Sequence, residues 1–361
     1  MKNISHSKTH FKKEFARLME QTSIPSNLNN EETVKRYSEI LSFIEANIPN
    51  KLFRFRKCNL DSIISFEQNT IPVCAASKFP DKYDSTVYYN HEAFEEKAKG
   101  TYNQFMPNIL KLLRSNPSAF PTNQFTLKAL ELIKSSKSEK EILVSLWHEF
   151  EPIFEEMKKR VIMQKLWPRN NKTTKIACFT ETVKSKFMWD AYADGYTGFA
   201  LEYDFARWRS LTANSHAVIL CPIIYTSQKM DATEMIEKLT AQDFIMENSQ
   251  VPDSIKQQYT SSCPIDRLYF QKIYLYKDKA EYSHEKEWRL LDIAPTTDLE
   301  VQSDFSSIPD AGCLKAIYYG SEMEPRYKAH LRNIAKQKGL REYDVVLDTH
   351  SKKYNLKLVK L

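Results

Sequence analysis

Two distant segments of this chain carry most of the side chains that could do chemistry. Residues 178–182 read Cys-Phe-Thr-Glu-Thr, and they lead on to Met-Trp-Asp-Ala-Tyr at 188–192. Residues 285–289 read Glu-Lys-Glu-Trp-Arg. If both segments open onto one cleft, they bring carboxylates, hydroxyls and a guanidinium together. That combination suits chemistry on a sugar or on a ligand that carries phosphate.

The segment 285–289 has the alternation of a strand. Glu285, Glu287 and Arg289 would then share one face, while Trp288 and Leu290 would anchor the other face in the core. The polar face offers two carboxylates and a guanidinium to a cleft. An ion-paired solvent face is the alternative, and surface pairs of that kind contribute only about 0–1 kcal/mol each.

Two further sets of side chains are candidate ligand contacts. Residues 53–56 alternate aromatic and basic, so Arg54 and Arg56 share a strand face, from which a planar bidentate donor could hold phosphate or ribose. Surface strand arginines are the alternative. Trp189 and Tyr192 lie one helical turn apart. They could be core residues or an aromatic wall on which nicotinamide or another base stacks.

Composition excludes several classes of protein. The six glycines do not cluster, so neither a Rossmann fingerprint nor a P-loop is present. The six cysteines form no C-x-x-C pair, which favours buried free thiols in a reducing compartment and predicts no metal. Without an apolar leader or a membrane-length apolar run, we expect a cytoplasmic protein that has no membrane partner.

The net charge of +6 is modest for 98 charged side chains, which are 52 basic and 46 acidic. One stretch is nevertheless purely basic. It is either a solvated helix end and loop or an electrostatic rim that attracts an anionic ligand such as a dinucleotide or nucleic acid. Its basic residues are Lys158, Lys159, Arg160, Lys165, Arg169, Lys172 and Lys175.

Hydrophobic periodicity predicts an α+β fold with a mainly antiparallel, interrupted sheet and large helical insertions. We expect an N-terminal helical segment over 1–50 and a single α+β domain over 51–361. Helical insertions fall at about 91–166 and 228–278, the first of them broken near its four prolines. Expected strands include 53–56, 71–76, 174–180, 199–203, 286–293, 315–319, 343–348 and 356–360. Another is 218–226, in which Pro222 favours an edge or a bulge.

With these segments placed, the chain resembles a bacterial family of proteins of unknown function, the domain-of-unknown-function 2971 family. The resemblance rests on Leu-Phe-Arg-Phe-Arg at 52–56, Phe-Pro-Asp-Lys-Tyr-Asp at 79–84, the block 178–204 and Glu-Lys-Glu-Trp-Arg at 285–289. The block is the most specific of the four. At 79–84 the chain departs from the family, since Pro80 and Lys82 replace its usual Asn and Pro.

The order of these motifs is also remotely similar to that of ADP-ribosyltransferases, so an ADP-ribosyltransferase-like core is expected. That resemblance implies that Arg54 takes the early-strand role, Thr180 and Thr182 the hydroxyl-bearing strand, and Glu285 with Glu287 the Glu-x-Glu. Glu287 would face the positive charge that develops on ribose when the nicotinamide bond of NAD breaks. Glu285 would position or deprotonate an acceptor, and the two threonines would orient Glu287.

The resemblance therefore implies an enzyme that consumes NAD as a substrate, by ADP-ribosyl transfer or by hydrolysis. A bacterial toxin or a phage-defence effector is the cellular role it suggests, with a nucleotide ligand and an unidentified macromolecular acceptor. A nucleic-acid-directed protein is the alternative, either a binder or a metal-dependent nuclease. Its metal ligands would be Asp84, Glu202, Asp204, Glu285 and Glu287. A non-catalytic nucleotide sensor that uses the same cleft is the third interpretation.

Overall fold

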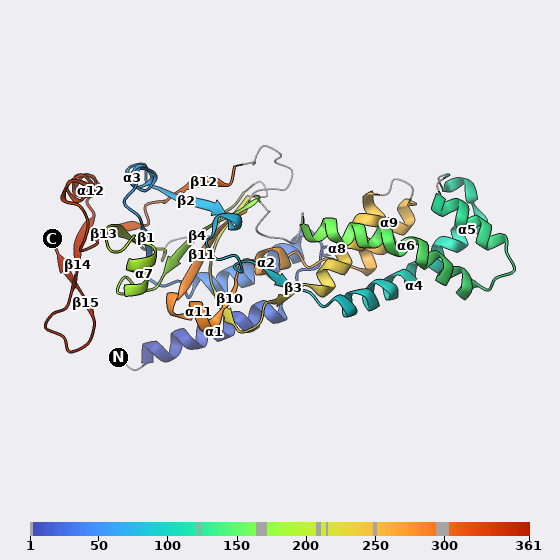
Figure 1. The fold of residues 1–361 in the computed structure, drawn as a ribbon, viewed down its shortest axis with the longest axis horizontal. Helices are drawn as coiled ribbons and strands as arrows, with labels where there is room; N and C mark the ends of the chain where they lie inside the picture. The colour runs from blue at the N-terminus through green and yellow to red at the C-terminus, as the bar shows by residue number, and fades with distance from the viewer. Residues whose placement is uncertain are drawn as a thin grey trace.

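The computed structural model describes residues 3–120, 122, 124–163, 172–206, 211–213, 216–247, 251–293 and 303–361. The strands of its main sheet (Figure 1) are β1 (Leu52–Arg56), β2 (Thr70–Ala75), β4 (Thr174–Thr180), β5 (Phe199–Tyr203), β6 (Leu211–Ala213), β7 (His216–Pro222), β11 (Glu287–Ile293), β12 (Phe305–Pro309), β13 (Leu314–Tyr319), β14 (Arg341–Leu347) and β15 (Leu356–Lys360).

Within these described ranges the eleven strands form one sheet. Its order is β15-β14-β13-β5-β1-β4-β11-β7-β6, and the pair β12-β2 joins it at β4. All neighbouring strands are antiparallel except β13 and β14, which are parallel. The α+β class with a mainly antiparallel sheet is therefore confirmed.

The sheet forks at β4. One edge of β4 pairs with β11 along the whole length of both strands. The other edge pairs with β2 at its beginning, through Ile176 and Cys74, and with β1 at its end, through Thr180 and Phe53. The strands β1 and β2 therefore separate over the middle of β4. A fork of this kind leaves room for a pocket beside the inner residues of β4.

Two short parallel pairs complete the strands. They are β3 (Val87–Tyr88) with β9 (Met230–Asp231), and β8 (Ile224–Thr226) with β10 (Tyr276–Asp278). The strand expected over 218–226 is thus divided at Pro222. At Pro222, β7 pairs with β11 and no longer with β6, which reaches only Val218. The next residue, Ile223, donates its N–H to the Glu287 carbonyl of β11, so the Pro222 nitrogen faces the edge that β6 does not reach, as expected of an edge position.

The helices are α1 (Asn3–Gln21), α2 (Asn30–Glu45), α3 (Leu60–Glu67), α4 (His91–Ser115), α5 (Gln124–Lys134), α6 (Glu139–Val161), α7 (Lys186–Ala191), α8 (Thr233–Glu247), α9 (Asp253–Ser262), α10 (Tyr269–Lys272), α11 (Lys279–Tyr282) and α12 (Pro325–Gln337). Short 3₁₀ turns are Ala76–Lys78, Pro117–Ala119 and Ser283–Glu285. At one end of the elongated molecule (Figure 1) lie the helices α4, α5, α6, α8 and α9, which we call the helical group. Within it, α8 packs on α4 and α6.

The expected breaks at two of the prolines are wrong, because Pro107 lies inside α4 and Pro152 inside α6. A proline in a helix interior costs about 3 kcal/mol or more. Both helices nevertheless bury large side chains on either side of the proline, among them Phe105 and Leu110 in α4. Burial of each such side chain contributes roughly 1.5–3 kcal/mol, so tertiary packing offsets the lost hydrogen bond. Pro121 lies outside the described residues.

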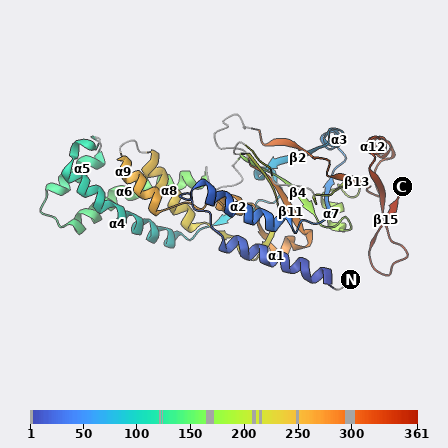
Figure 2. The same cartoon turned by 180° about the vertical axis from the view of Figure 1, so that it is seen from behind.

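Helices α1 and α2 pack beside the sheet (Figure 2). Phe11 of α1 stacks on Trp288 of β11 with ring centroids 6.0 Å apart, and it also contacts Phe43 of α2. The buried side chains of α1, α2, the sheet and the helical group form one continuous core cluster. A second cluster, which contains Phe53, Phe55 and Trp189, joins β1 to α7.

Candidate functional site

A pocket of about 530 Å³ lies at the fork, within the roughly 300–1,000 Å³ usual for ligand sites. We call it the fork pocket. It gathers residues from β1, β2, β4, α7, β10, β11 and the loop before β3. Its lining consists of Phe53, Arg54, Phe55, Arg56, Cys74, Phe79, Pro80, Asp81, Asp84, Ile176, Cys178, Phe179, Phe187, Met188, Tyr192, Lys277, Tyr282, Glu285, Glu287 and Arg289.

Glu287 and Arg289 occupy one face of β11, as the alternation predicted. Their cross-strand partners on β4 are Thr180 and Cys178, and cross-strand partners share a face of a sheet. Arg289 Nε donates to Glu287 Oε1 at 2.8 Å. Trp288, on the opposite face, is almost fully buried against α1. The solvent-exposed ion-paired face is thereby excluded, because Glu287 is 3% exposed and Arg289 is 0% exposed.

Glu285 reaches the same place by a different route from the one expected. It lies in the 3₁₀ turn before β11, and Lys286 takes a left-handed conformation with φ of 50°. The strand therefore begins at Glu287 and not at Glu285. Thr180 Oγ1 donates to the backbone oxygen of Glu285 at 2.6 Å. The hydroxyl of Tyr192 donates to Glu285 Oε1 at 2.8 Å.

Lys277 of β10 joins the two glutamates. Its Nζ lies 2.7 Å from Glu285 Oε2 and 2.9 Å from Glu287 Oε2. No sequence pattern predicted this contact, because residue 277 falls inside the segment expected as a helical insertion. A lone lysine at the end of such a segment is most often exposed.

Asp84 completes the network. Its carboxylate accepts two hydrogen bonds from the Arg289 guanidinium, at Nη1 and Nη2. Arg289 Nη1 also donates to the Tyr274 carbonyl at 2.7 Å. Every side of this guanidinium is therefore used inside the protein. Arg289 therefore acts as an anchor that fixes Glu287 and the loop carrying Asp84, and its contact with a ligand stays a prediction.

Burial and charge together determine the ionisation of the network. Burial by itself would raise the pKa of Glu287, but Arg289 and Lys277 outweigh it and lower that pKa. Burial would likewise lower the pKa of Lys277, but the carboxylates of Glu287, Glu285 and Asp84 raise it. Both groups are therefore charged at neutral pH. Three carboxylates against two cations, Lys277 and Arg289, leave this network one net negative charge.

Arg54 and Arg56 line the fork pocket from β1, while Phe53 and Phe55 pack into the second core cluster. Arg54 Nη1 is buried and has no hydrogen-bond partner among the described residues. The Arg54 guanidinium lies 5.8 Å from the centre of the Phe179 ring. Arg56 Nε donates to Ser62 Oγ at 3.2 Å. The pocket thus holds two guanidinium groups, one of which has an unused buried donor.

Both guanidinium groups are destabilised in their charged form. Burial lowers the pKa of Arg54. Burial, together with the neighbouring charge of Arg54, lowers the pKa of Arg56 to about 10. An anion beside them would restore the missing interactions. This wall of the pocket is therefore suited to an anionic group of a ligand.

Two of the predicted ligand contacts are placed elsewhere. Trp189 is fully buried, donates its indole N–H to the Val183 carbonyl at 2.7 Å and stacks with Tyr196. It is a core residue and does not line the fork pocket. Thr182 is also absent from the lining, and its N–H faces Thr180 Oγ1 at 3.4 Å. Thr180 holds Glu285 in place through the backbone oxygen of that residue.

Of the five carboxylates considered for a nuclease, Asp84, Glu285 and Glu287 meet around Lys277, whereas the other two lie elsewhere. Glu202 lies on β5, where it binds Arg341 at 2.6 Å and the Tyr318 hydroxyl. Asp204 caps the following turn through the N–H of Ala206. In the described part of the chain, no group of three or more His, Cys, Asp or Glu side chains has an arrangement able to hold a metal ion.

The basic stretch does not form a continuous surface. Lys158 is buried and pairs with Glu155, and Lys172 pairs with Asp304. Lys175 is buried in β4. Lys165 and Arg169 lie outside the described residues. The six cysteines are free thiols, and burial raises the pKa of Cys178 in the pocket wall, so its thiol is a poor nucleophile.

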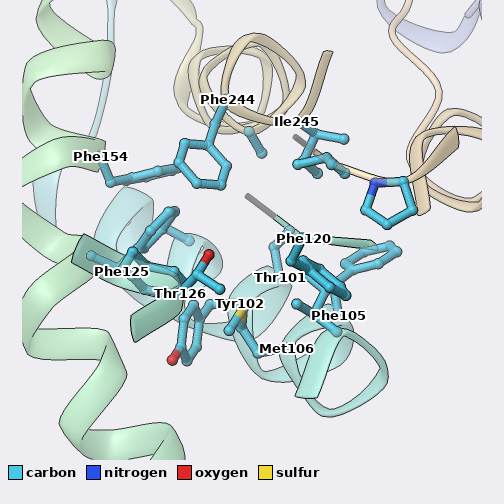
Figure 3. A pocket seen from close by; sticks show the side chains of 16 residues that line it. Thr101, Tyr102, Phe105, Met106, Phe120, Phe125, Thr126, Phe154, Phe244 and Ile245 are labelled. Atoms are coloured by element: carbon cyan, nitrogen blue, oxygen red, sulfur yellow. The ribbon is translucent and has the colours of Figure 1, made fainter. Parts of the chain in front are cut away.

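A second cavity, of about 100 Å³, lies within the helical group (Figure 3). Aromatic and aliphatic side chains of α4, α6 and α8 surround it, including Phe105, Phe154 and Phe244. Of its few polar groups, the hydroxyls of Thr101 and Tyr102 bond to Glu237 and to the Leu143 carbonyl. It therefore lacks the charged groups that make the fork pocket a candidate site. None of the described helices is long and apolar enough to cross a lipid bilayer.

Comparison with known proteins gives one family. No curated protein and no solved structure matches the chain. Residues 188–290 match the model described as Protein of unknown function (DUF2971). This range contains Tyr192, Lys277 and the Glu285–Arg289 segment, but not β1 or the loop that carries Asp84. Over residues 188–290 the chain is therefore shown to match DUF2971, the family that its motifs predicted.

Proposed function

We propose that this protein consumes NAD by breaking the bond between nicotinamide and ribose, as ADP-ribosyltransferases and NAD glycohydrolases do. One observation carries the proposal. The fork pocket places an arginine with an unused buried donor, Arg54, in the same cavity as the buried carboxylates Glu285 and Glu287.

The charges of the pocket fit the two ends of this reaction. Arg54 and Arg56 offer guanidinium groups to the pyrophosphate of NAD, for which bidentate donors are well suited. The network of Asp84, Glu285 and Glu287 with its two cations keeps one net negative charge. That charge would face the ribose, where positive charge develops as nicotinamide leaves.

Glu287 is suited to stabilise charge and not to transfer protons. Its carboxylate is held by Arg289 Nε at 2.8 Å and by Lys277 Nζ at 2.9 Å, and both cations lower its pKa. It therefore stays anionic across the neutral range. We propose that Glu287 binds the ribose hydroxyl and stabilises the positive charge that develops on the ribose. An interaction that is stronger in the transition state than in the ground state accelerates the bond cleavage.

Glu285 and Tyr192 would act on the incoming nucleophile. Tyr192 lines the fork pocket, and its hydroxyl orients Glu285 Oε1 at 2.8 Å. A carboxylate in this position can accept a proton from water or from another acceptor. An enzyme of this kind would deplete cellular NAD, which fits a toxin or a phage-defence effector.

The test is nicotinamide release from NAD by the purified protein, beside Glu287→Gln and an exposed control, Glu39→Gln. We expect release by the wild type and by Glu39→Gln, and a loss of at least tenfold, about 1.4 kcal/mol in the barrier, in Glu287→Gln. A smaller loss would remove Glu287 from this role. Circular dichroism checks that each variant is folded.

NAD binding distinguishes the remaining interpretations. A rise in melting temperature with NAD but no nicotinamide release would favour a nucleotide sensor. If the protein neither releases nicotinamide nor binds NAD, the proposal is contradicted. In that case the nucleic-acid alternative would be tested by binding to DNA and RNA, whose affinity should fall steeply with salt if phosphate contacts dominate.

A further inference from the structure

A third cavity, of about 450 Å³, adjoins the fork pocket. We call it the side pocket. The two pockets share four lining residues, Asp81, Asp84, Lys277 and Tyr282. The remaining lining of the side pocket comes from the loop before β3, from the end of β8 and the loop after it, from β10 and from α11. The two cavities are therefore neighbours that a single wall separates.

The shared wall belongs to the charge network of the candidate site. Lys277 Nζ lies 4.2 Å from the centre of the Tyr282 ring, and it bonds to Glu285 at 2.7 Å. One side chain thus stands between the side pocket and the carboxylate to which we assign proton transfer.

The side pocket has the lining of a site for a polar cation. Hydroxyl and amide groups line it, from Thr86, Thr226, Ser227, Gln228, Tyr276 and Tyr282. Its lining carries the carboxylates of Asp81, Asp278 and Glu281 and the ammonium group of Lys229, while the carboxylate of Asp84 is paired with Arg289. Lys277 directs its charge to Glu285 and Glu287 on the far side of the wall. Lys229 lies over the ring of Tyr83, 5.0 Å from its centre.

We propose that the side pocket binds the acceptor of an ADP-ribosyl transfer, and that this acceptor carries an amine or a guanidinium. The proposal rests on the function proposed for the fork pocket. It also decides the reaction type, since a hydrolase needs only water, whereas a second polar cavity beside the carboxylates provides for a second substrate.

The transfer is balanced as follows. The nicotinamide–ribose bond of NAD breaks, and its electron pair goes to the nicotinamide nitrogen. Glu285 accepts one proton from the cationic nitrogen of the acceptor and later passes it to water. The lone pair freed on that nitrogen then bonds to the ribose carbon. The products are the ADP-ribosylated acceptor, nicotinamide and a proton.

The probe is agmatine, which carries an amine at one end and a guanidinium at the other. It is compared with 4-guanidinobutyrate, which keeps the guanidinium but replaces the amine with a carboxylate. The variant is Glu281→Lys on α11, an exposed residue outside the fork pocket. The matched control is Glu149→Lys, an exposed residue of α6 in the helical group. Mass spectrometry measures the ADP-ribosylated product, and nicotinamide release without an acceptor measures hydrolysis.

We expect agmatine to be modified at least fivefold faster than 4-guanidinobutyrate. Glu281→Lys should lower kcat/KM for agmatine about fivefold, as expected for two units of charge at a solvated pocket. The rate of NAD hydrolysis should be unchanged in Glu281→Lys. In the control Glu149→Lys, kcat/KM for agmatine should be unchanged. The acceptor site is wrong if NAD is hydrolysed but agmatine is not modified. It is also wrong if Glu281→Lys leaves the rate of agmatine modification unchanged. In both cases the proposed function stands.

Calorimetry of agmatine binding without NAD tests the side pocket in the case where the protein has no activity on NAD. If NAD is neither bound nor cleaved, the function proposed for the fork pocket fails. Agmatine binding that Glu281→Lys weakens would then retain the side pocket as a cation site, although not as an acceptor site. The absence of any agmatine binding would overturn the side pocket as well.

Discussion

At the residue scale, some buried charges of the fork pocket are ion-paired within the protein, whereas the charge of Arg54 is not paired among the described residues. Glu287 and Arg289 are fully compensated by Lys277 and Asp84. Arg54 has a buried donor that meets no partner in the described part of the chain. A compensated buried pair is costly to break, whereas an uncompensated group is costly to keep. Substitutions on the two sides of the pocket should therefore change stability in opposite directions.

Arg54→Met tests the uncompensated side. We expect the free energy of unfolding to rise by about 1 kcal/mol, because an apolar side chain of similar length leaves no unsatisfied donor. NAD affinity should fall about tenfold or more, as for the loss of a charged hydrogen bond. Urea denaturation and calorimetry with NAD measure the two effects.

Arg341→Met is the matched control. This arginine binds Glu202, which is buried, at 2.6 Å. Its loss should destabilise the fold and leave NAD affinity unchanged. If Arg54→Met destabilises the protein as much as Arg341→Met does, Arg54 has a structural partner and the ligand role is wrong.

The pH dependence of stability tests the compensated side. The pKa of Glu287 is lowered in the fold, from an ordinary value of about 4.3. Its contribution is therefore fully present above that ordinary value and is lost as the pH falls through the folded pKa. We expect the urea midpoint to be insensitive to Glu287 between pH 5 and 8 and to fall below about pH 4. A Glu287→Gln variant should lack this part of the acid loss, and identical acid profiles would contradict the assignment.

At the element scale, two glycines decide how closely the strands and the α7 turn can approach. A Cβ on Gly198 would lie 2.2 Å from the carbonyl oxygen of Arg56, and a Cβ on Gly320 would lie 2.0 Å from that of Tyr196. The end of β1 therefore packs directly against the chain that enters β5. This close approach fixes the backbone from which Arg54 and Arg56 reach the fork pocket.

Gly198→Ala should therefore damage both the fold and the site. We expect a loss of about 2 kcal/mol or more in the free energy of unfolding, as for an overpacked core position. Gly100→Ala is the matched control, because a Cβ there meets nothing within 4 Å inside α4. It should instead stabilise the protein by about 0.5–1 kcal/mol. Thermal unfolding measures both variants, and equal effects would show that the close contact at Gly198 carries no strain.

At the scale of the whole molecule, the N-terminal helices are continuous with the core that supports the site. Phe11 stacks on Trp288, the neighbour of both Glu287 and Arg289. Phe15 and Met19 belong to the same core cluster as the sheet. The helices of the N-terminal segment thus share their hydrophobic core with the rest of the protein.

Phe15→Ala tests this continuity. Phe15 is 1% exposed, and a phenylalanine truncated in a core costs about 3–5 kcal/mol. We expect the main unfolding transition, followed by tryptophan fluorescence, to shift by this amount as a single step. A small early transition that leaves the main one in place would show that α1 unfolds independently.

Local patterns in the sequence were enough to predict much of the sheet. Alternation at 53–56 and 286–290 predicted β1 and β11 and the faces of Arg54, Glu287 and Trp288. Strand β12 and helix α12 were not predicted. Pro107 and Pro152 misled the prediction of helix ends, because burial of the neighbouring side chains outweighs the proline penalty.

The sequence by itself therefore determined which side chains share a strand face, since that depends only on a period of two along one segment. The tertiary structure alone decided that Lys277 and Asp84 join Glu287, that Trp189 is a core residue, and that a fork in the sheet opens a pocket between β1 and β2. These contacts join segments far apart in the chain. Charges that are removed from water need partners, and the packing of distant segments decides which groups lie close enough to pair. Local periodicity contains no information about the spatial distance between distant segments.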